Sequence, residues 1–161
     1  MRLQPRLLTA LAVLALLHTP VRAEDTPSNM GPADSGSTRP AADPLGPARN
    51  AIAAQQWPRA LDLLKAQLPQ LNRNADLHNL LGFAYRKQAR PDLPKAFEHY
   101  KLALSIDPRH RGAHEYIGEA YLMNKQPAKA REHLDTLKTL CGGTTCEEYQ
   151  DLAKALAAYR D

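Results

Sequence analysis

The sequence lacks an apolar run long enough to cross a membrane. Its longest such run, residues 7–17, covers eleven residues. As a helix this run would rise about 16 Å, roughly half the hydrocarbon thickness of a bilayer, so no integral membrane span is expected. The run follows Arg2 and Arg6 and precedes Val21-Arg22-Ala23, where small residues suit cleavage. Residues 1–23 are therefore predicted to be a signal peptide that is cleaved after Ala23.

The chain also lacks a strong excess of charge of one sign. It carries 21 basic and 17 acidic residues, but three arginines and no acid lie in residues 1–23, which leaves 18 and 17 for the remainder. Charges of both signs are interspersed along that remainder. Binding to nucleic acid or to an anionic membrane surface is therefore not expected.

Motifs that would indicate catalysis or a bound cofactor are missing as well. The sequence has no Gly-rich phosphate loop, no Ser/His/Asp order and no paired carboxylates that would share a pocket. Glu147-Glu148 is better interpreted as favourable charge in the first turn of a helix. We therefore expect a protein that is not an enzyme and that needs no cofactor.

Residues 24–42 are rich in Pro, Gly, Ser, Thr and Ala and hold few large apolar side chains. Such a segment cannot bury enough surface to offset the entropy lost on ordering, so a flexible linker is predicted. No cysteine lies at the end of the signal peptide, directly after its apolar run, so a bacterial lipid anchor is not expected. The expected location is outside the cytoplasm, in the bacterial periplasm.

What the chain does contain is an internal repeat. LGFAY at residues 81–85 recurs as IGEAY at residues 117–121, 36 residues later, and Ala96 is echoed by Ala130. Ala60, 36 residues before Ala96, begins a third and weaker copy. A period in the mid-thirties is typical of stacked antiparallel helix pairs, each of which completes its core against a neighbour. We predict an all-α solenoid of three helix hairpins over residues 43–144 and a capping helix over residues 145–161.

Three prolines and one threonine indicate where helices begin and end. One helix is expected to run until Pro69, and Pro91 and Pro94 are expected in the turn before a later helix. Thr145, followed three residues later by Glu148, has the form of a capping box at the start of the capping helix.

These repeats resemble the tetratricopeptide repeat family over residues 43–144. The matching residues are Trp57 and Ala60 in the first unit, Gly82, Tyr85, Ala96, Tyr100, Ala103 and Pro108 in the second, and Gly118, Tyr121 and Ala130 in the third. The resemblance implies a right-handed superhelix in which the Gly lets the two helices of a hairpin approach closely. It also implies a concave groove, lined by the first helix of each hairpin, that binds a segment of another protein.

Helical position predicts six residues of the groove: Asn79, Phe83, Arg86, Glu115, Glu119 and Leu122. Some family members hold a C-terminal carboxylate with Lys, Arg and Asn at groove positions. Here two acids, Glu115 and Glu119, occupy the groove and would repel a carboxylate. A basic or apolar partner segment is expected instead, with Phe83 and Leu122 contacting an apolar anchor.

The two cysteines, Cys141 and Cys146, are separated by four residues that include Gly142-Gly143. In an exported protein this spacing favours a disulfide, which would fix the capping helix to the last hairpin and contribute about 2 kcal/mol. Two other interpretations stay open, a redox-active thiol pair and a soft-metal site with Met123 or a histidine.

Four histidines recur by position. His78 and His114 match in successive first helices, and His99 and His133 match in second helices. A zinc array would show such recurrence, but repeats also copy packing positions, and packing is the favoured interpretation. His110 and His114 would suit a metal only if their helix began before His110.

The sequence thus predicts a scaffold that binds another protein or peptide segment without catalysis. Two alternatives are a metal-handling or thiol-redox accessory protein that uses Cys141 and Cys146, and a structural subunit that associates with itself. The sequence does not indicate the oligomeric state.

Overall fold

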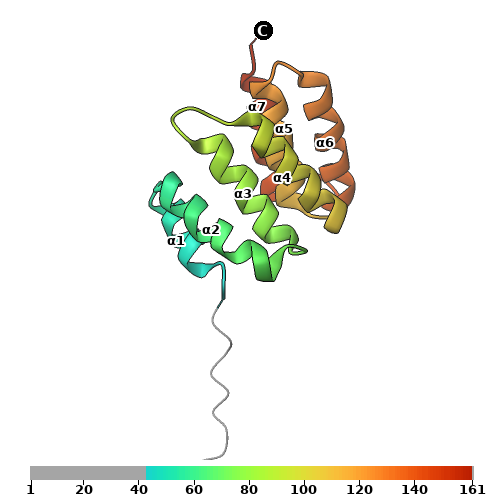
Figure 1. The fold of residues 1–161 in the computed structure, drawn as a ribbon. Helices are drawn as coiled ribbons and strands as arrows, with labels where there is room; N and C mark the ends of the chain where they lie inside the picture. The colour runs from blue at the N-terminus through green and yellow to red at the C-terminus, as the bar shows by residue number, and fades with distance from the viewer. Residues whose placement is uncertain (1–42, 161) are drawn as a thin grey trace, which may run out of the picture. The chain divides into compact units, whose positions relative to one another are not determined.

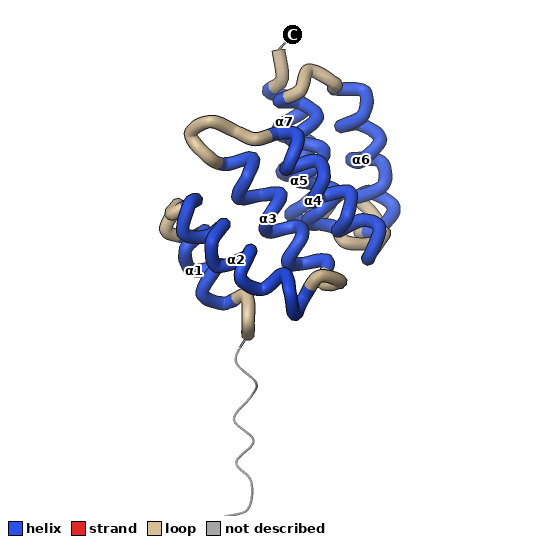
Figure 2. Tube along the Cα trace, in the orientation of Figure 1, coloured by secondary structure: helices blue, strands red, loops and turns tan. Residues whose placement is uncertain are grey.

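The computed structural model describes residues 43–160, which form seven helices and no strand (Figures 1 and 2). The predicted signal peptide (residues 1–23) and the predicted linker (residues 24–42) lie outside the described residues. The helices are α1 (Gly46–Ala53), α2 (Trp57–Leu71), α3 (Ala75–Lys87), α4 (Leu93–Ile106), α5 (Arg111–Met123), α6 (Pro127–Leu140) and α7 (Glu147–Ala158). Among the described helices, none is long and apolar enough to cross a membrane.

The helices pair as hairpins, α1 with α2, α3 with α4 and α5 with α6. Each hairpin packs on the next through α2 against α3 and α4 against α5, and α3 also contacts α5 (Figure 1). The all-α repeat fold predicted from the sequence is thus confirmed. The alanines of the repeat, Ala60, Ala96 and Ala130, are all fully buried at the helix contacts, because any larger side chain there would separate the helices.

Two glycines make close helix contacts, and only one of them does so as the family pattern implies. A Cβ on Gly82 would lie 2.6 Å from the ring of Tyr100, so this Gly does let α3 and α4 of one hairpin approach closely. The same interpretation is wrong for Gly118. Its Cβ would lie 2.6 Å from Cδ2 of Leu152 on α7, because α7 packs along α5 at this position.

The C-terminal helix closes a small second core. Leu152 is fully buried with Leu122, Ala130 and Leu137, and half-buried side chains such as Tyr149 surround them. Since the last hairpin has no fourth hairpin to cover it, α7 supplies the missing apolar face.

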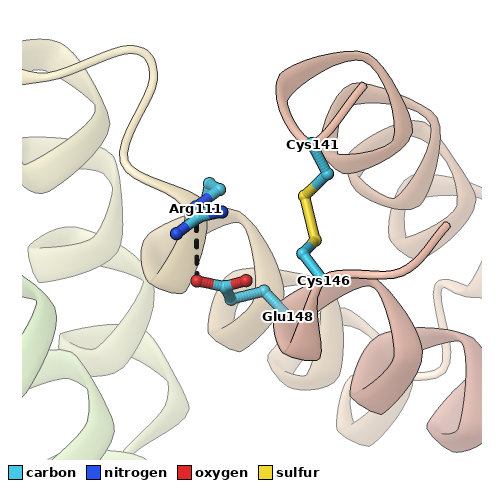
Figure 3. The surroundings of a disulfide bond; sticks show 4 residues. All are labelled: Arg111, Cys141, Cys146 and Glu148. Atoms are coloured by element: carbon cyan, nitrogen blue, oxygen red, sulfur yellow. Dashed lines mark ion pairs between the residues drawn. A yellow bond between two sulfur atoms is a disulfide. The ribbon is translucent and has the colours of Figure 1, made fainter. Parts of the chain in front are cut away.

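A disulfide joins Cys141 at the end of α6 to Cys146 at the start of α7 (Figure 3). Gly142 and Gly143 lie between them with φ of 65° and 155°, a region of backbone conformation that favours glycine. The connection between α6 and α7 is therefore short and fixed at both ends, as the sequence predicts.

Three predicted helix boundaries are wrong. Pro94 lies in the first turn of α4, where the missing N–H would have had no helical partner. Pro69 lies inside α2, which continues because Leu68 and Leu71 still pack on the core. Thr145 does not cap α7: the cap residue is Cys146, which makes no side-chain capping bond and is held by its disulfide.

Candidate partner-binding groove

The six residues predicted to line the groove come from the facing sides of α3 and α5, and most of them are buried. Asn79, Arg86, Glu115 and Leu122 are only 6–8% exposed, whereas Phe83 and Glu119 are half-buried. The structure brings Arg86 of α3 together with Glu119 of α5. Contact of these residues with a partner remains a prediction.

Arg86 is the centre of the polar contacts between α3 and α5. Its Nη2 lies 2.5 Å from Oε2 of Glu119, and its Nε donates a hydrogen bond of 3.2 Å to the hydroxyl of Tyr100. The guanidinium also lies 5.5 Å from the ring centroids of both Phe83 and Tyr116. Arg86 thus connects α3 to α4 and α5 through one hydrogen bond, one ion pair and two ring contacts.

Glu115 differs from Glu119 because it has no hydrogen bond or ion pair within the described residues. Burial, followed by the nearby charges of Glu119, Asp151 and Glu148, raises the pKa of Glu115 to about 8 against the opposing effect of Arg86. The carboxyl group therefore carries a proton at neutral pH in the free protein. The groove thus presents one paired acid and one neutral acid, rather than the two free acids that the sequence suggested.

A hollow of about 400 Å³ lies between α3, α5 and α7. Its lining residues are Arg86, Lys87, Glu119, Leu122, Met123, Ala155, Ala158 and Tyr159. Met123 is 45% exposed, one of two large apolar side chains left so open in the described part of the chain. Sequence reasoning missed the contribution of α7, although α7 occupies the place that the first helix of a fourth hairpin would take.

The recurring histidines form one hydrogen-bonded pair in each of two hairpins. Nδ1 of His78 lies 3.1 Å from Nδ1 of His99, and Nε2 of His78 lies 2.9 Å from the carbonyl oxygen of Asn72. A carbonyl can only accept, so Nε2 of His78 donates to Asn72. Both nitrogens of His78 therefore take part in hydrogen bonds.

The second pair repeats this geometry. Nδ1 of His114 lies 2.9 Å from Nδ1 of His133, and Nε2 of His114 lies 3.0 Å from the carbonyl oxygen of Pro108. Burial, followed by the neighbouring His114, lowers the pKa of His133 to about 4. Burial and His78 likewise lower the pKa of His99. These pairs pack the two helices of a hairpin together and leave no set of ring nitrogens for a zinc array.

The other metal candidates are also engaged in contacts. Nδ1 of His110 accepts from the backbone N–H of Ala113, and its Nε2 lies 2.9 Å from Asp76. Within residues 43–160, one group of three potential ligand atoms lies close together: Cys141, Cys146 and Glu148. Its two sulfur atoms are bonded to each other, and Glu148 pairs with Arg111 at 3.3 Å, as the dashed line of Figure 3 shows.

Three comparisons with known proteins bear on this arrangement. No family model matches the chain. A segment of 65 residues is 32% identical to part of E3 SUMO-protein ligase RanBP2 of Drosophila melanogaster; it covers 40% of this chain and spans 2% of that much longer protein. The TPR2B domain of yeast Sti1, solved in a complex with pHsp70, is similar with a TM-score of 0.61 and 20% identity, covering 71% of this chain and 93% of that chain.

The structural match assigns a fold class to the chain. The hairpin array of residues 43–160 has the fold of a tetratricopeptide repeat domain, with α7 as its capping helix. The likeness at 20% identity concerns the arrangement of helices and leaves the partner to be inferred from this chain's own surface.

Proposed function

We propose that this protein is a non-enzymatic scaffold that holds a segment of another protein on the surface formed by α3, α5 and α7. The observation that carries the proposal is the hollow of about 400 Å³, with the exposed Met123 in its wall. An apolar side chain of the partner would fill this hollow against Leu122 and Ala155 and supply most of the binding free energy. The solved complex of the Sti1 domain supports a binding role for the fold.

The proposed location is outside the cytoplasm, with the bacterial periplasm as the specific compartment. The disulfide between Cys141 and Cys146 supports an oxidising environment. Since this bond fixes α7 to α6, and α7 forms one wall of the hollow, an oxidising compartment would also keep the proposed surface assembled.

Met123 and Leu102 allow a matched test, because they are exposed to similar extents, 45% and 40%, and only Met123 lines the hollow. Protein purified without reductant is used to capture partners from the exported fraction of the source cells, in parallel with Met123→Asp and Leu102→Asp. We expect wild type and Leu102→Asp to recover the same partner and Met123→Asp to lose it. Equal recovery by all three proteins would show that the hollow is not the binding site.

A further inference from the structure

Three potential metal ligands come together where α6 ends and α7 begins (Figure 3). One ligand atom from each of Cys141, Cys146 and Glu148 lies within 4.8 Å of the other two, and all three side chains are half-buried. We call these three residues the Cys–Cys–Glu group. Two sulfurs and one carboxylate oxygen form a donor set that zinc accepts, with a fourth position left for water.

The backbone between the two cysteines holds them at a separation that suits a metal ion. Two thiolates bound to one tetrahedral zinc ion, each about 2.3 Å from it, place their sulfurs about 3.8 Å apart. The Cα atoms of Cys141 and Cys146 are 6.0 Å apart, so a change of side-chain rotamer can open the sulfurs to that separation while the helices stay in place. Gly142 and Gly143 leave room for small adjustments, because a Cβ added to either would meet no atom within 4 Å.

The charges around the group suit a divalent cation. Two thiolates and the carboxylate of Glu148 would carry three negative charges. Nε of Arg111 lies 3.3 Å from Oε1 of Glu148 and brings one positive charge, so a divalent ion would make the sum zero. A carboxylate has about four lone pairs, and the contact with Arg111 leaves others free for a metal while it orients the group.

The composition of the group favours zinc over other metals. Calcium and magnesium prefer oxygen ligands, and copper(I) prefers sulfur. Met123, which the sequence suggested as a further sulfur ligand, lies at the opposite end of α5 from Arg111, roughly 18 Å along the helix. Within the part of the chain that the structure describes, no histidine joins the group either. The soft-metal site with Met123 or a histidine is therefore not formed.

We propose that the reduced chain binds one zinc ion through the thiolates of Cys141 and Cys146 and a carboxylate oxygen of Glu148. Reduction comes first, because the two sulfurs are bonded to each other in the structure. A dithiol reductant supplies two electrons and two protons, its own sulfurs become a disulfide, and the bond between the cysteines breaks to give two thiols. Zinc then replaces the two thiol protons, which pass to the buffer.

The bound ion would connect α6 to α7 in the reduced chain, as the disulfide does in the oxidised chain. Since α7 forms one wall of the hollow, the hollow would keep its shape in either redox state once zinc is present. This inference goes beyond the scaffold function and does not depend on it.

The test uses the full chain, reduced with a phosphine, freed of metal with a chelator and kept without oxygen. Cobalt(II) is added first, because its absorption reports both tetrahedral geometry and the number of bound thiolates. The chain has two cysteines, so any thiolate signal comes from this pair. Zinc is then added to displace cobalt, and competition with a chromophoric chelator gives its affinity.

Three variants and the oxidised protein complete the design. Cys141→Ser removes one sulfur, and Glu148→Gln removes the carboxylate. Glu147→Gln is the matched control, since Glu147 is the preceding residue, is exposed and lies outside the group.

We expect reduced wild type to bind one ion per chain with two thiolate ligands, and the oxidised protein to bind none. Glu148→Gln should weaken zinc binding by about tenfold or more, because loss of even an outer partner of a metal ligand costs about 10–100-fold. Glu147→Gln should bind as wild type does. Zinc should raise the midpoint of thermal unfolding of reduced wild type and should leave that of reduced Cys141→Ser unchanged.

Four results would overturn the proposal. They are absence of zinc binding by the reduced chain, equal affinity of Glu148→Gln and wild type, one ion shared between two chains, and zinc binding by the oxidised protein with the affinity of the reduced one. The scaffold proposal would stand after any of them, because it depends on the hollow and on Met123.

Discussion

Replacing Gly118 with Ala tests how closely α5 and α7 approach. The added Cβ would lie 2.6 Å and 2.8 Å from Cδ2 and Cδ1 of Leu152, closer than carbon atoms pack. Leu152 is fully buried, so its side chain has no solvent into which to move. Overpacking of this kind costs about 1–3 kcal/mol, and the better helix propensity of Ala returns at most about 1 kcal/mol. We expect a net loss of about 1–2 kcal/mol in the free energy of unfolding.

Urea unfolding followed by far-ultraviolet circular dichroism measures this loss, and Gly112→Ala is the control. A Cβ on Gly112 would lie 3.2 Å from the side-chain nitrogen of Asn79, and Gly112 is partly exposed near the start of α5. This substitution should leave stability unchanged or raise it by up to about 1 kcal/mol.

A double substitution distinguishes a direct clash from a general effect on α5. Leu152→Ala alone should cost about 2–5 kcal/mol, because it leaves a cavity in the second core. In that background the Cβ of Gly118→Ala enters the space left by Leu152, so its destabilising effect should disappear. If Gly118→Ala stabilises wild type as Gly112→Ala does, or costs the same with and without Leu152, the close contact of α5 with α7 does not exist in solution.

Three further predictions concern titration and the disulfide. Glu115→Gln should be more stable than wild type by about 1–3 kcal/mol near pH 8 and equally stable near pH 4.5. The reason is that the raised pKa of Glu115 makes its ionisation in the folded state unfavourable as pH rises from about 4.5 to 8. Urea midpoints at both pH values check this prediction. His133→Gln should lessen the loss of stability as pH falls from about 6.5 to 4, because in this range His133 is protonated in the unfolded state and not in the folded state. The expected effect is about 1–2 kcal/mol after solvent screening, and an unchanged pH profile of the free energy of unfolding would contradict it. Reduction with dithiothreitol should cost about 2 kcal/mol in wild type and nothing in a variant with Cys141→Ser and Cys146→Ser, as compared by thermal unfolding.

The parts of the fold that the sequence predicts well are those set by local pattern. Ala60, Ala96 and Ala130 stand at one spacing because each fills the same contact between helices, and all three are fully buried. Such positions depend on the repeat alone, so a single sequence reveals them. Helix ends were predicted less well because tertiary packing decides them: Pro69 stays helical since residues beyond it still reach the core.

The candidate site was only partly predictable, for a physical reason. Helical period indicates which side chains share a face, and two of the residues that it assigned to one face, Arg86 and Glu119, lie in contact. It does not indicate what covers that face. The raised pKa of Glu115 depends in part on Glu148 and Asp151 of α7, a helix that lies outside the repeat. The protonation of Glu115 and the pairing of Arg86 with Glu119 therefore required the three-dimensional structure.

The histidine pairs show which contacts a repeated unit conserves within one chain. Each pair lies inside a single hairpin, with separations of 21 and 19 residues, and each first-helix histidine donates to a carbonyl six residues earlier. Copying a hairpin copies both partners and the bond between them. Contacts between a hairpin and the element that follows it have one partner in each, so they can differ from unit to unit. Gly118 of α5, for example, meets Leu152 of α7.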